Sequence, residues 1–276
     1  MDDTNTVTLV TTFNHTLWER YARLCLRSWA SHLPESIDVW VYDESGVGQS
    51  NGQQGKWPAH WEWQDPFEYA AYREFMNDHT TQNIQDYRRD VRRFAHKVFA
   101  LGHASLHCRS EYLIWLDADV FIFEDIPADF FPSLFNGHFL FYLSRHAYTH
   151  SECGCWGMDT RLATRPFFPL ALEALYRSGS VLDLPEQHDS FVFDWLRKRQ
   201  ESAGLITSHD LTPHVPKGHA WLASPLASYM DHWKGDRWKT FKSWQEDVSG
   251  MTGRGIKLNL THPYWRNLPS RVGARK

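Results

Sequence analysis

Two aspartates, Asp117 and Asp119, interrupt an otherwise apolar stretch that reads YLIWL-DAD-VFIF. Two ionised carboxylates in such a run are costly unless a nearby charge compensates them. Residues i and i+2 of an extended segment point to the same side, so we expect the two carboxylates to converge. Converging carboxylate oxygens suit Mg²⁺ or Mn²⁺, which can stabilise a departing diphosphate. The alternative is a surface turn with two acidic residues, which the preceding apolar strand disfavours.

The segments before these aspartates predict an α/β fold with a mostly parallel sheet flanked by helices. Residues 6–12 (TVTLVTT) and 37–42 (IDVWVY) are β-branched and apolar, which predicts two buried strands. A capping box that starts at Thr16 predicts a helix between them, so the three elements form a βαβ unit. Ligands of such sheets bind beyond the carboxyl ends of the strands. Asn14 and Asp43 follow the two strands and are therefore predicted to contact a ligand.

A second unit leads directly into the Asp-Ala-Asp triplet. Residues 86–107 form an amphipathic helix by their spacing, and residues 112–116 form the next buried strand. Arg93 and Lys97 lie on this helix, and their charges predict contacts with phosphate or sugar groups. The polar segment 45–85 between the two units is predicted to be an irregular excursion, a candidate lid.

The remaining half of the chain carries a weaker pattern. A strand is predicted at 139–143 and helices at 169–178 and 186–199. Residues 215–276 are rich in Trp and His and show little periodicity. We expect a C-terminal section that packs over the cleft, which makes residues 1–276 a single domain.

Composition narrows the classes of partner. A net charge of −4 gives no general attraction to nucleic acid or to anionic membranes. The 14 Trp, 17 Phe and 11 Tyr exceed what a core of this size needs, so some rings are expected to line a cleft. The four cysteines are too few for a disulfide framework, and Cys153 and Cys155 lack a second Cys/His pair at zinc spacing. Without a signal-peptide pattern or a membrane-length apolar run, a cytoplasmic location is expected.

Several segments, in order, resemble the GT-A nucleotide-sugar glycosyltransferases, and among them the family-8-like group that includes glycogenin and lipooligosaccharide galactosyltransferases. The similarity is densest where RFAHK is followed by EYLIWLDADVFIFEDIP. The other matching segments are TVTLVTTFN, IDVWVYDES, ECGCWGM (152–158), EQHD (186–189) and HWKG (232–235).

The resemblance implies further site residues. It makes His232 the third protein ligand of the metal, a set that suits Mn²⁺ better than oxygen ligands alone do. It places Gly154 at the sugar pocket and Asp189 among the active-site carboxylates. A lysine six residues after the histidine contacts phosphate in the family. Here that position is Trp238, and Lys239 follows it.

The predicted function is transfer of a sugar from a nucleoside diphosphate, with UDP favoured, to an acceptor hydroxyl. The family-8 resemblance implies retention of anomeric configuration, whereas Asp189 acting as a general base implies inversion. A glycan or small molecule is the expected acceptor, and the acidic net charge disfavours a modified DNA base. Two other classes compete: a HAD-like phosphatase, which places its Asp-x-Asp earlier in the chain, and a non-catalytic carbohydrate-binding protein, which the Trp content favours.

Overall fold

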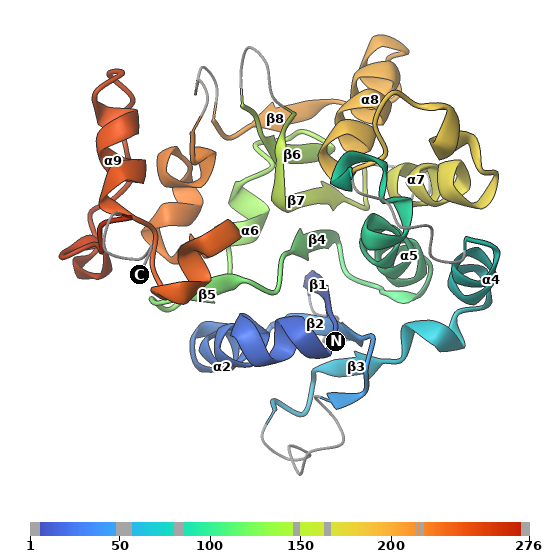
Figure 1. The fold of residues 1–276 in the computed structure, drawn as a ribbon, viewed down its shortest axis with the longest axis horizontal. Helices are drawn as coiled ribbons and strands as arrows, with labels where there is room; N and C mark the ends of the chain where they lie inside the picture. Colours follow the sequence, from blue (N-terminus) through green and yellow to red (C-terminus); the bar gives the residue numbers. More distant parts are fainter. Residues whose placement is uncertain are drawn as a thin grey trace.

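A seven-stranded sheet in the order β3-β2-β1-β4-β7-β6-β8 forms the centre of the molecule (Figure 1). The computed structural model describes residues 6–47, 57–79, 86–145, 150–162, 167–212, 215 and 218–271. The strands of this sheet are β1 (Val7–Phe13), β2 (Ile37–Asp43), β3 (Glu62–Gln64), β4 (Tyr112–Leu116), β6 (Leu140–Leu143), β7 (Glu152–Asp159) and β8 (Ser208–Asp210). A second sheet pairs β5 (Val120–Ile122) with β9 (Met230–His232).

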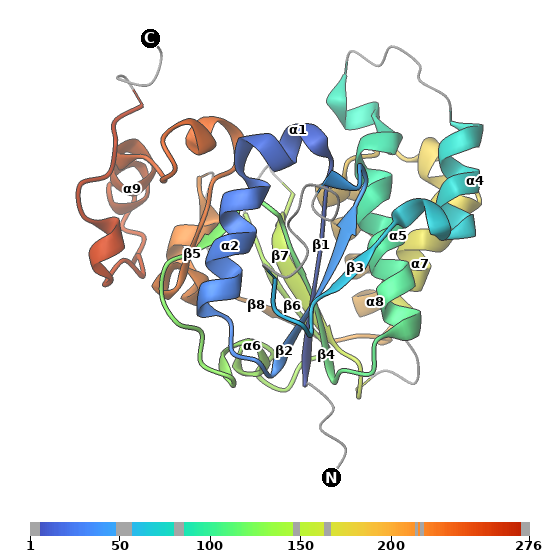
Figure 2. The ribbon, with the colours of Figure 1, turned by 90° about the horizontal axis from the view of Figure 1, so that it is seen from below.

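Helices cover both faces of the sheet, as the prediction of an α/β fold requires. Figure 2 shows α2 on one side of the strands and α4, α5 and α7 on the other. The helices are α1 (His15–Leu17), α2 (Arg23–His32), α4 (Ala70–Asp78), α5 (Val91–His107), α6 (Phe130–Ser133), α7 (Phe167–Arg177), α8 (Asp189–Ser202) and α9 (Gln245–Thr252), with a π-helical turn at Trp18–Ala22 between α1 and α2.

Side chains of the strands alternate between two cores, one on each face. Val39 and Val41 of β2 join the core beneath α2, while Trp40 and Tyr42 join the core beneath α4, α5, α7 and α8. This period of two is what a strand buried on both faces needs, and it explains why the strand reads as a continuous apolar run.

The sheet is mostly parallel, as predicted. Four of its six strand pairs are parallel, and the two antiparallel pairs both involve β7. Because β1, β2 and β4 run in the same direction, their carboxyl ends meet at one edge of the sheet. That edge carries the residues that follow each strand, including Asn14 and Asp117.

Some element boundaries differ from the sequence-based predictions. The first helix begins at His15, because Asn14 and not Thr16 accepts the capping hydrogen bond, from the Leu17 amide. The helix predicted from residue 86 begins at Val91, where the Asp90 side chain caps it. The segment 45–85 is not irregular throughout, since β3 and the amphipathic helix α4 lie within its described part. Its polar composition masked the helical face.

The C-terminal section shares the core of the N-terminal half. Trp221 and Trp265 pack in the same cluster as Trp29 of α2, and the Trp29 indole donates a 2.7 Å hydrogen bond to the Val120 carbonyl. The pairing of β5 with β9 adds a backbone link between the two parts. All four cysteines are free. In the part of the chain that the structure describes, no helix is both long and apolar enough to cross a membrane.

Candidate metal and donor site

Pairing of β5 with β9 brings three potential metal ligands together. Val120 lies opposite His232 in this pairing, so the histidine lies beside the aspartate that precedes Val120. His232 Nε2 is 3.0 Å from Asp119 Oδ1 and 3.7 Å from Asp117 Oδ2. The three side chains each offer an atom within 4.8 Å of the others, as a shared ion requires. The sequence-predicted ligands therefore converge.

The two aspartates converge through a turn, which differs from the extended segment predicted. The Val120 amide donates to the Asp117 carbonyl at 3.0 Å, and the Asp117 amide donates to the Gly154 carbonyl at 2.8 Å. The chain thus reverses after β4 before it enters β5. Both carboxylates still face His232, because the turn places them on the same side.

Several polar atoms of this cluster are buried without a hydrogen bond. Among the described residues, Asp119 Oδ1 and both ring nitrogens of His232 have no partner with hydrogen-bond geometry, although the Asp119–His232 distance is short. Buried unpartnered polar atoms are costly, so a group of them that face one another calls for a ligand. A divalent cation would satisfy them, and the two oxygens and one nitrogen suit Mn²⁺.

Gly154 and Glu152 of β7 support His232 from behind. A Cβ atom at Gly154 would lie 2.4 Å from His232 Cε1, so only glycine allows the ring to occupy this position. Glu152 Oε1 lies 4.0 Å from His232 Nδ1 and accepts a hydrogen bond of 2.7 Å from Lys234. Carboxylates behind a ligating histidine orient the ring and raise its basicity.

Lys97 occupies the centre of a buried ionic network on the other side of Asp117. Its Nζ lies 3.0 Å from Asp189 Oδ2 and 3.2 Å from Asp117 Oδ1, and donates to the Cys153 carbonyl at 2.6 Å. Burial opposes its charged form, but the two carboxylates outweigh burial and raise the pKa of Lys97. Trp115 lies under the ammonium and donates its indole N–H to Asp117.

The carboxylates respond differently to the same burial. Burial raises the pKa of Asp117 despite Lys97 nearby. At Asp119 the effect of burial is outweighed by His232, and its pKa is lowered. At Asp189 burial is likewise outweighed, chiefly by Lys97, so its pKa is lowered as well. The charge balance of the site therefore depends on cations close to every acidic group.

A cavity of about 560 Å³ opens beside these groups at the carboxyl edge of the sheet. Six of the sequence-predicted residues line it: Asn14, Arg93, Lys97, Asp117, Asp119 and Asp189. His232 lies behind the two aspartates and is fully buried. The cavity also exposes groups that the sequence did not single out, among them Thr12, Tyr21, Glu44, His96 and Trp115.

Besides His232, three predicted residues lie outside the cavity lining. Asp43 is buried, and its Oδ1 accepts hydrogen bonds from the amide and hydroxyl of Ser45. Gly154 contacts His232 and not the cavity. Lys239 forms an ion pair of 2.9 Å with Asp236 on an exposed turn, Gly235–Lys239. Donor contacts by these residues stay predictions.

Glu44, one residue beyond Asp43, is the cavity carboxylate that sequence reasoning missed. Thr12 donates to its Oε1 at 2.8 Å, and His96 Nδ1 lies 3.2 Å from its Oε2. Burial raises the pKa of Glu44 to about 7, and burial lowers the pKa of His96 to about 4. The sequence did carry a signal for this residue, since Asp43 and Glu44 follow one another at the end of β2. Neighbouring side chains of an extended segment point to opposite sides, so one of the two acids could face the cavity while the other faced away from it.

Comparisons with known proteins give no sequence match and several structural similarities. No family model and no curated protein matches the chain. Mouse xyloside xylosyltransferase 1 is similar in structure with a TM-score of 0.46, at 11% identity over 74% of this chain and 84% of that one. A glycosyltransferase involved in glycosylation of the PBCV-1 major capsid has a TM-score of 0.44 at 10% identity. The similarity covers 85% of this chain and 98% of that one.

A third similar structure is GlyE, a glycosyltransferase of Streptococcus pneumoniae. Its TM-score is 0.42 at 13% identity, over 74% of this chain and 45% of that one. All three TM-scores lie below 0.5.

Proposed function

We propose that this protein is a metal-dependent glycosyltransferase that uses a nucleoside-diphosphate sugar. One observation supports this more than any other: Asp117, Asp119 and His232 converge with buried, unpartnered ligand atoms at the edge of a cavity. Cationic side chains, Lys97 and Arg93, line the same cavity. An anion-rich donor with its own cation matches that arrangement of charges.

The three ligands would hold Mn²⁺ or Mg²⁺, and when bound the ion would neutralise the diphosphate and favour its departure. Lys97 holds the Asp117 carboxylate in place through the 3.2 Å ion pair, and its charge favours the ionised form of that carboxylate. Arg93 is exposed at the cavity wall, where its planar guanidinium can donate two parallel hydrogen bonds to phosphate.

Asp189 is proposed as the carboxylate closest to the sugar. It lies at the first residue of α8, where the Ser190 amide donates to Oδ1 at 2.8 Å and Lys97 contacts Oδ2. Both contacts favour the ionised form, so it would stabilise positive charge that develops at the anomeric carbon. Its pKa is lowered, which makes it a weaker general base. Retention is proposed on the family-8 resemblance.

The nucleoside is proposed to bind at the ends of β1 and β2. Asn14, Thr12 and Glu44 offer amide, hydroxyl and carboxyl groups there, as a ribose and a base require. UDP-sugars remain the favoured donors, and a glycan or small molecule is the proposed acceptor. A DNA acceptor is disfavoured by the net charge of −4.

A thermal-shift titration with nucleotide sugars, with and without Mn²⁺, tests the proposal. Stabilisation that needs both the nucleotide sugar and Mn²⁺ is expected, since bound ligands shift unfolding by mass action. Release of UDP from the stabilising UDP-sugar then reports turnover. Stabilisation by free sugar alone, with no effect of nucleotide or Mn²⁺, would identify a carbohydrate-binding protein instead.

A further inference from the structure

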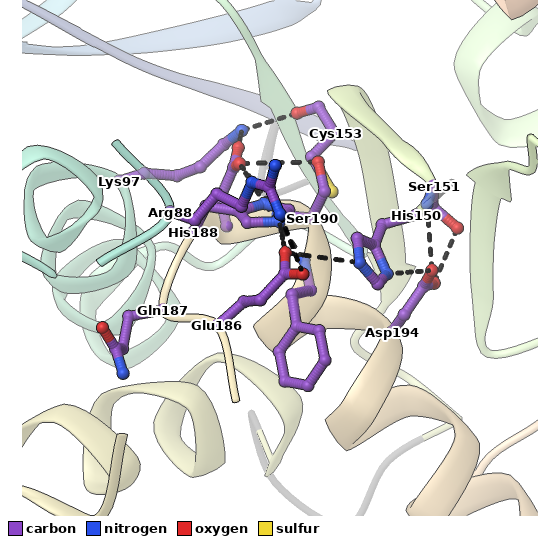
Figure 3. A network of polar contacts seen from close by, with 12 residues as sticks. Arg88, Lys97, His150, Ser151, Cys153, Glu186, Gln187, His188, Ser190 and Asp194 are labelled. Carbon is purple, nitrogen blue, oxygen red and sulfur yellow. Dashed lines mark hydrogen bonds and ion pairs between the residues drawn. The ribbon is translucent and has the colours of Figure 1, made fainter. Parts of the chain in front are cut away.

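We propose that His150, Glu186 and His188 form a second metal-ion site, of the class that binds Zn²⁺. The three side chains each offer a ligand atom within 4.8 Å of the others. Figure 3 shows His150 and His188 on either side of Glu186, at the start of α8. Two histidines and one glutamate, with a fourth position open to water, are an established ligand set for zinc.

The ligand atoms are close to the spacing that a tetrahedral ion needs. Bonds of about 2.0–2.1 Å place neighbouring ligands roughly 3.3 Å apart. His150 Nε2 lies 3.6 Å from Glu186 Oε2, near that value. His188 Nε2 lies 2.7 Å from the same oxygen, a hydrogen-bond distance that must lengthen by a small rotation of the Glu186 side chain.

A carboxylate lies 4.0 Å from the other ring nitrogen of each histidine, on the side where metal-binding histidines commonly have a carboxylate. His150 Nδ1 is 4.0 Å from Asp194 Oδ2, and Asp194 is itself fixed by the amide and hydroxyl of Ser151 (Figure 3). His188 Nδ1 is 4.0 Å from Asp189 Oδ1. Both rings therefore direct Nε2 toward Glu186 and Nδ1 toward a carboxylate that lies 4.0 Å away. With a metal ion on Nε2, each carboxylate would be placed to accept the proton of Nδ1 after a small shift.

One further contact of the described structure must change when an ion binds, whereas the ion pair of Arg88 need not. His188 Nδ1 accepts a long hydrogen bond of 3.4 Å from the Phe191 amide, which would give way to donation toward Asp189. Arg88 lies 3.8 Å from Glu186, but on Oε1, and its side chain is 54% exposed. The oxygen that faces the histidines is Oε2, so the guanidinium leaves the ligand atom accessible.

The consequence of this site is a link between two segments near the donor cavity. One ion would tie His150, just before β7, to the residues that open α8. Asp189 follows His188 directly and contacts Lys97, so metal binding would fix the position of Asp189. Binding of the ion itself does not depend on the proposed transferase activity.

Titration with Co²⁺, followed by competition with Zn²⁺, tests this site in full-length protein. The background for the titration is the Asp117→Asn/Asp119→Asn variant, stripped of metal with a chelator. In this variant the first cluster contributes neither metal binding nor activity. We expect one equivalent of Co²⁺ with the intense visible absorption of a four-coordinate ion, displaced by Zn²⁺. Adding His150→Gln and His188→Gln should weaken binding by about 100-fold or more.

His138→Gln is the matched control in the same background, because His138 is a half-buried histidine outside the cluster. It should leave the Co²⁺ spectrum and affinity unchanged. Far-UV circular dichroism and a melting curve establish that each variant is folded. The proposal is overturned if the stripped protein takes up no Co²⁺ or Zn²⁺ at micromolar concentration, or if the folded double-histidine variant binds as tightly as its parent.

Discussion

The two proposed metal sites of this protein differ in how the fold brings their side chains together. In the first, Asp117, Asp119 and His232 are brought together by strand pairing across more than a hundred residues, and His232 is fully buried. In the second, the side chains come from two chain segments, next to β7 and α8. Burial is the same in both clusters, since each has one buried histidine, His232 or His188, and two half-buried ligands.

The difference has an energetic meaning. In the first cluster, Asp119 Oδ1 and both ring nitrogens of His232 have no hydrogen-bond partners without an ion, which is costly. In the second cluster, Glu186 is already paired with Arg88 and His188 when no ion is bound. The first cluster is therefore suited to hold charge at a fixed position for catalysis, and the second to respond to the concentration of an ion.

Removal of a carboxylate from the first cluster gives the largest expected effect. Asp117→Ala and Asp119→Ala should each lower Mn²⁺-dependent donor turnover by roughly 1,000-fold, because charge stabilisation of the leaving diphosphate is lost. The measurement is UDP release at saturating Mn²⁺. Asp125→Ala, a control at an exposed carboxylate six residues from Asp119, should retain the parent rate. Unchanged donor hydrolysis by both cluster variants would refute the assignment.

Lys97 contacts carboxylates on both sides of the cavity, and its neutralisation gives the next largest effect. Lys97→Met leaves the half-buried Asp117 and Asp189 without their cation, which should cost about 3 kcal/mol of unfolding free energy. Turnover should fall by about 100-fold. Urea denaturation and steady-state kinetics measure the two effects. Lys198→Met, at an exposed lysine of α8, is the control that should change neither.

Glu44 shows how a cavity carboxylate behaves without a charged partner. Burial, more than the neighbouring Asp43, raises its pKa to about 7, while the hydrogen bond from Thr12 acts in the opposite direction. His96 beside it is neutral near pH 7, since burial lowers its pKa to about 4. Folding therefore favours the protonated acid, and this stabilisation, complete below about pH 4, is lost as the pH rises through 7.

The Glu44→Gln variant isolates this contribution. Between pH 5 and 8 the unfolding free energy of the parent should fall by about 2 kcal/mol relative to that of the variant. Denaturant melts of both proteins at several pH values measure the difference. A difference that is constant with pH would show that Glu44 is ionised throughout the range.

The sequence predicted the parallel half of the fold and the first cluster for physical reasons. Strands β1, β2 and β4 are buried on both faces, so they read as apolar runs, and the residues that follow them had to meet at one edge. Asp117 and Asp119 were recognisable because charge inside such a run needs compensation. His232 came from a resemblance, since its strand is three residues long and gives no periodic signal.

Other parts of the site could not be predicted because they depend on tertiary packing. The helix α4 hides a buried face of four residues within a polar segment. Lys97 and Lys239 each lie near one of the sequence segments that predicted the site. Only the fold shows that Lys97 is buried, at 8% exposure, and that Lys239 is exposed. His150, Glu186 and His188 have no spacing typical of zinc ligands, because two loops supply them.

The smallest expected effect comes from a single methyl group behind the first cluster. In Gly154→Ala the new Cβ would lie 2.4 Å from His232 Cε1, so the ring must move away from the two aspartates. Mn²⁺ affinity should fall by about 10-fold, which is typical for loss of a supporting contact.

Gly157→Ala is the matched control on the same strand, because its Cβ would meet Phe141 and Ile114 at 2.7 and 2.8 Å. Both variants should be destabilised by overpacking, but only the first should bind Mn²⁺ more weakly in a calorimetric titration. Equal Mn²⁺ affinities for the two variants would mean that His232 is not a ligand.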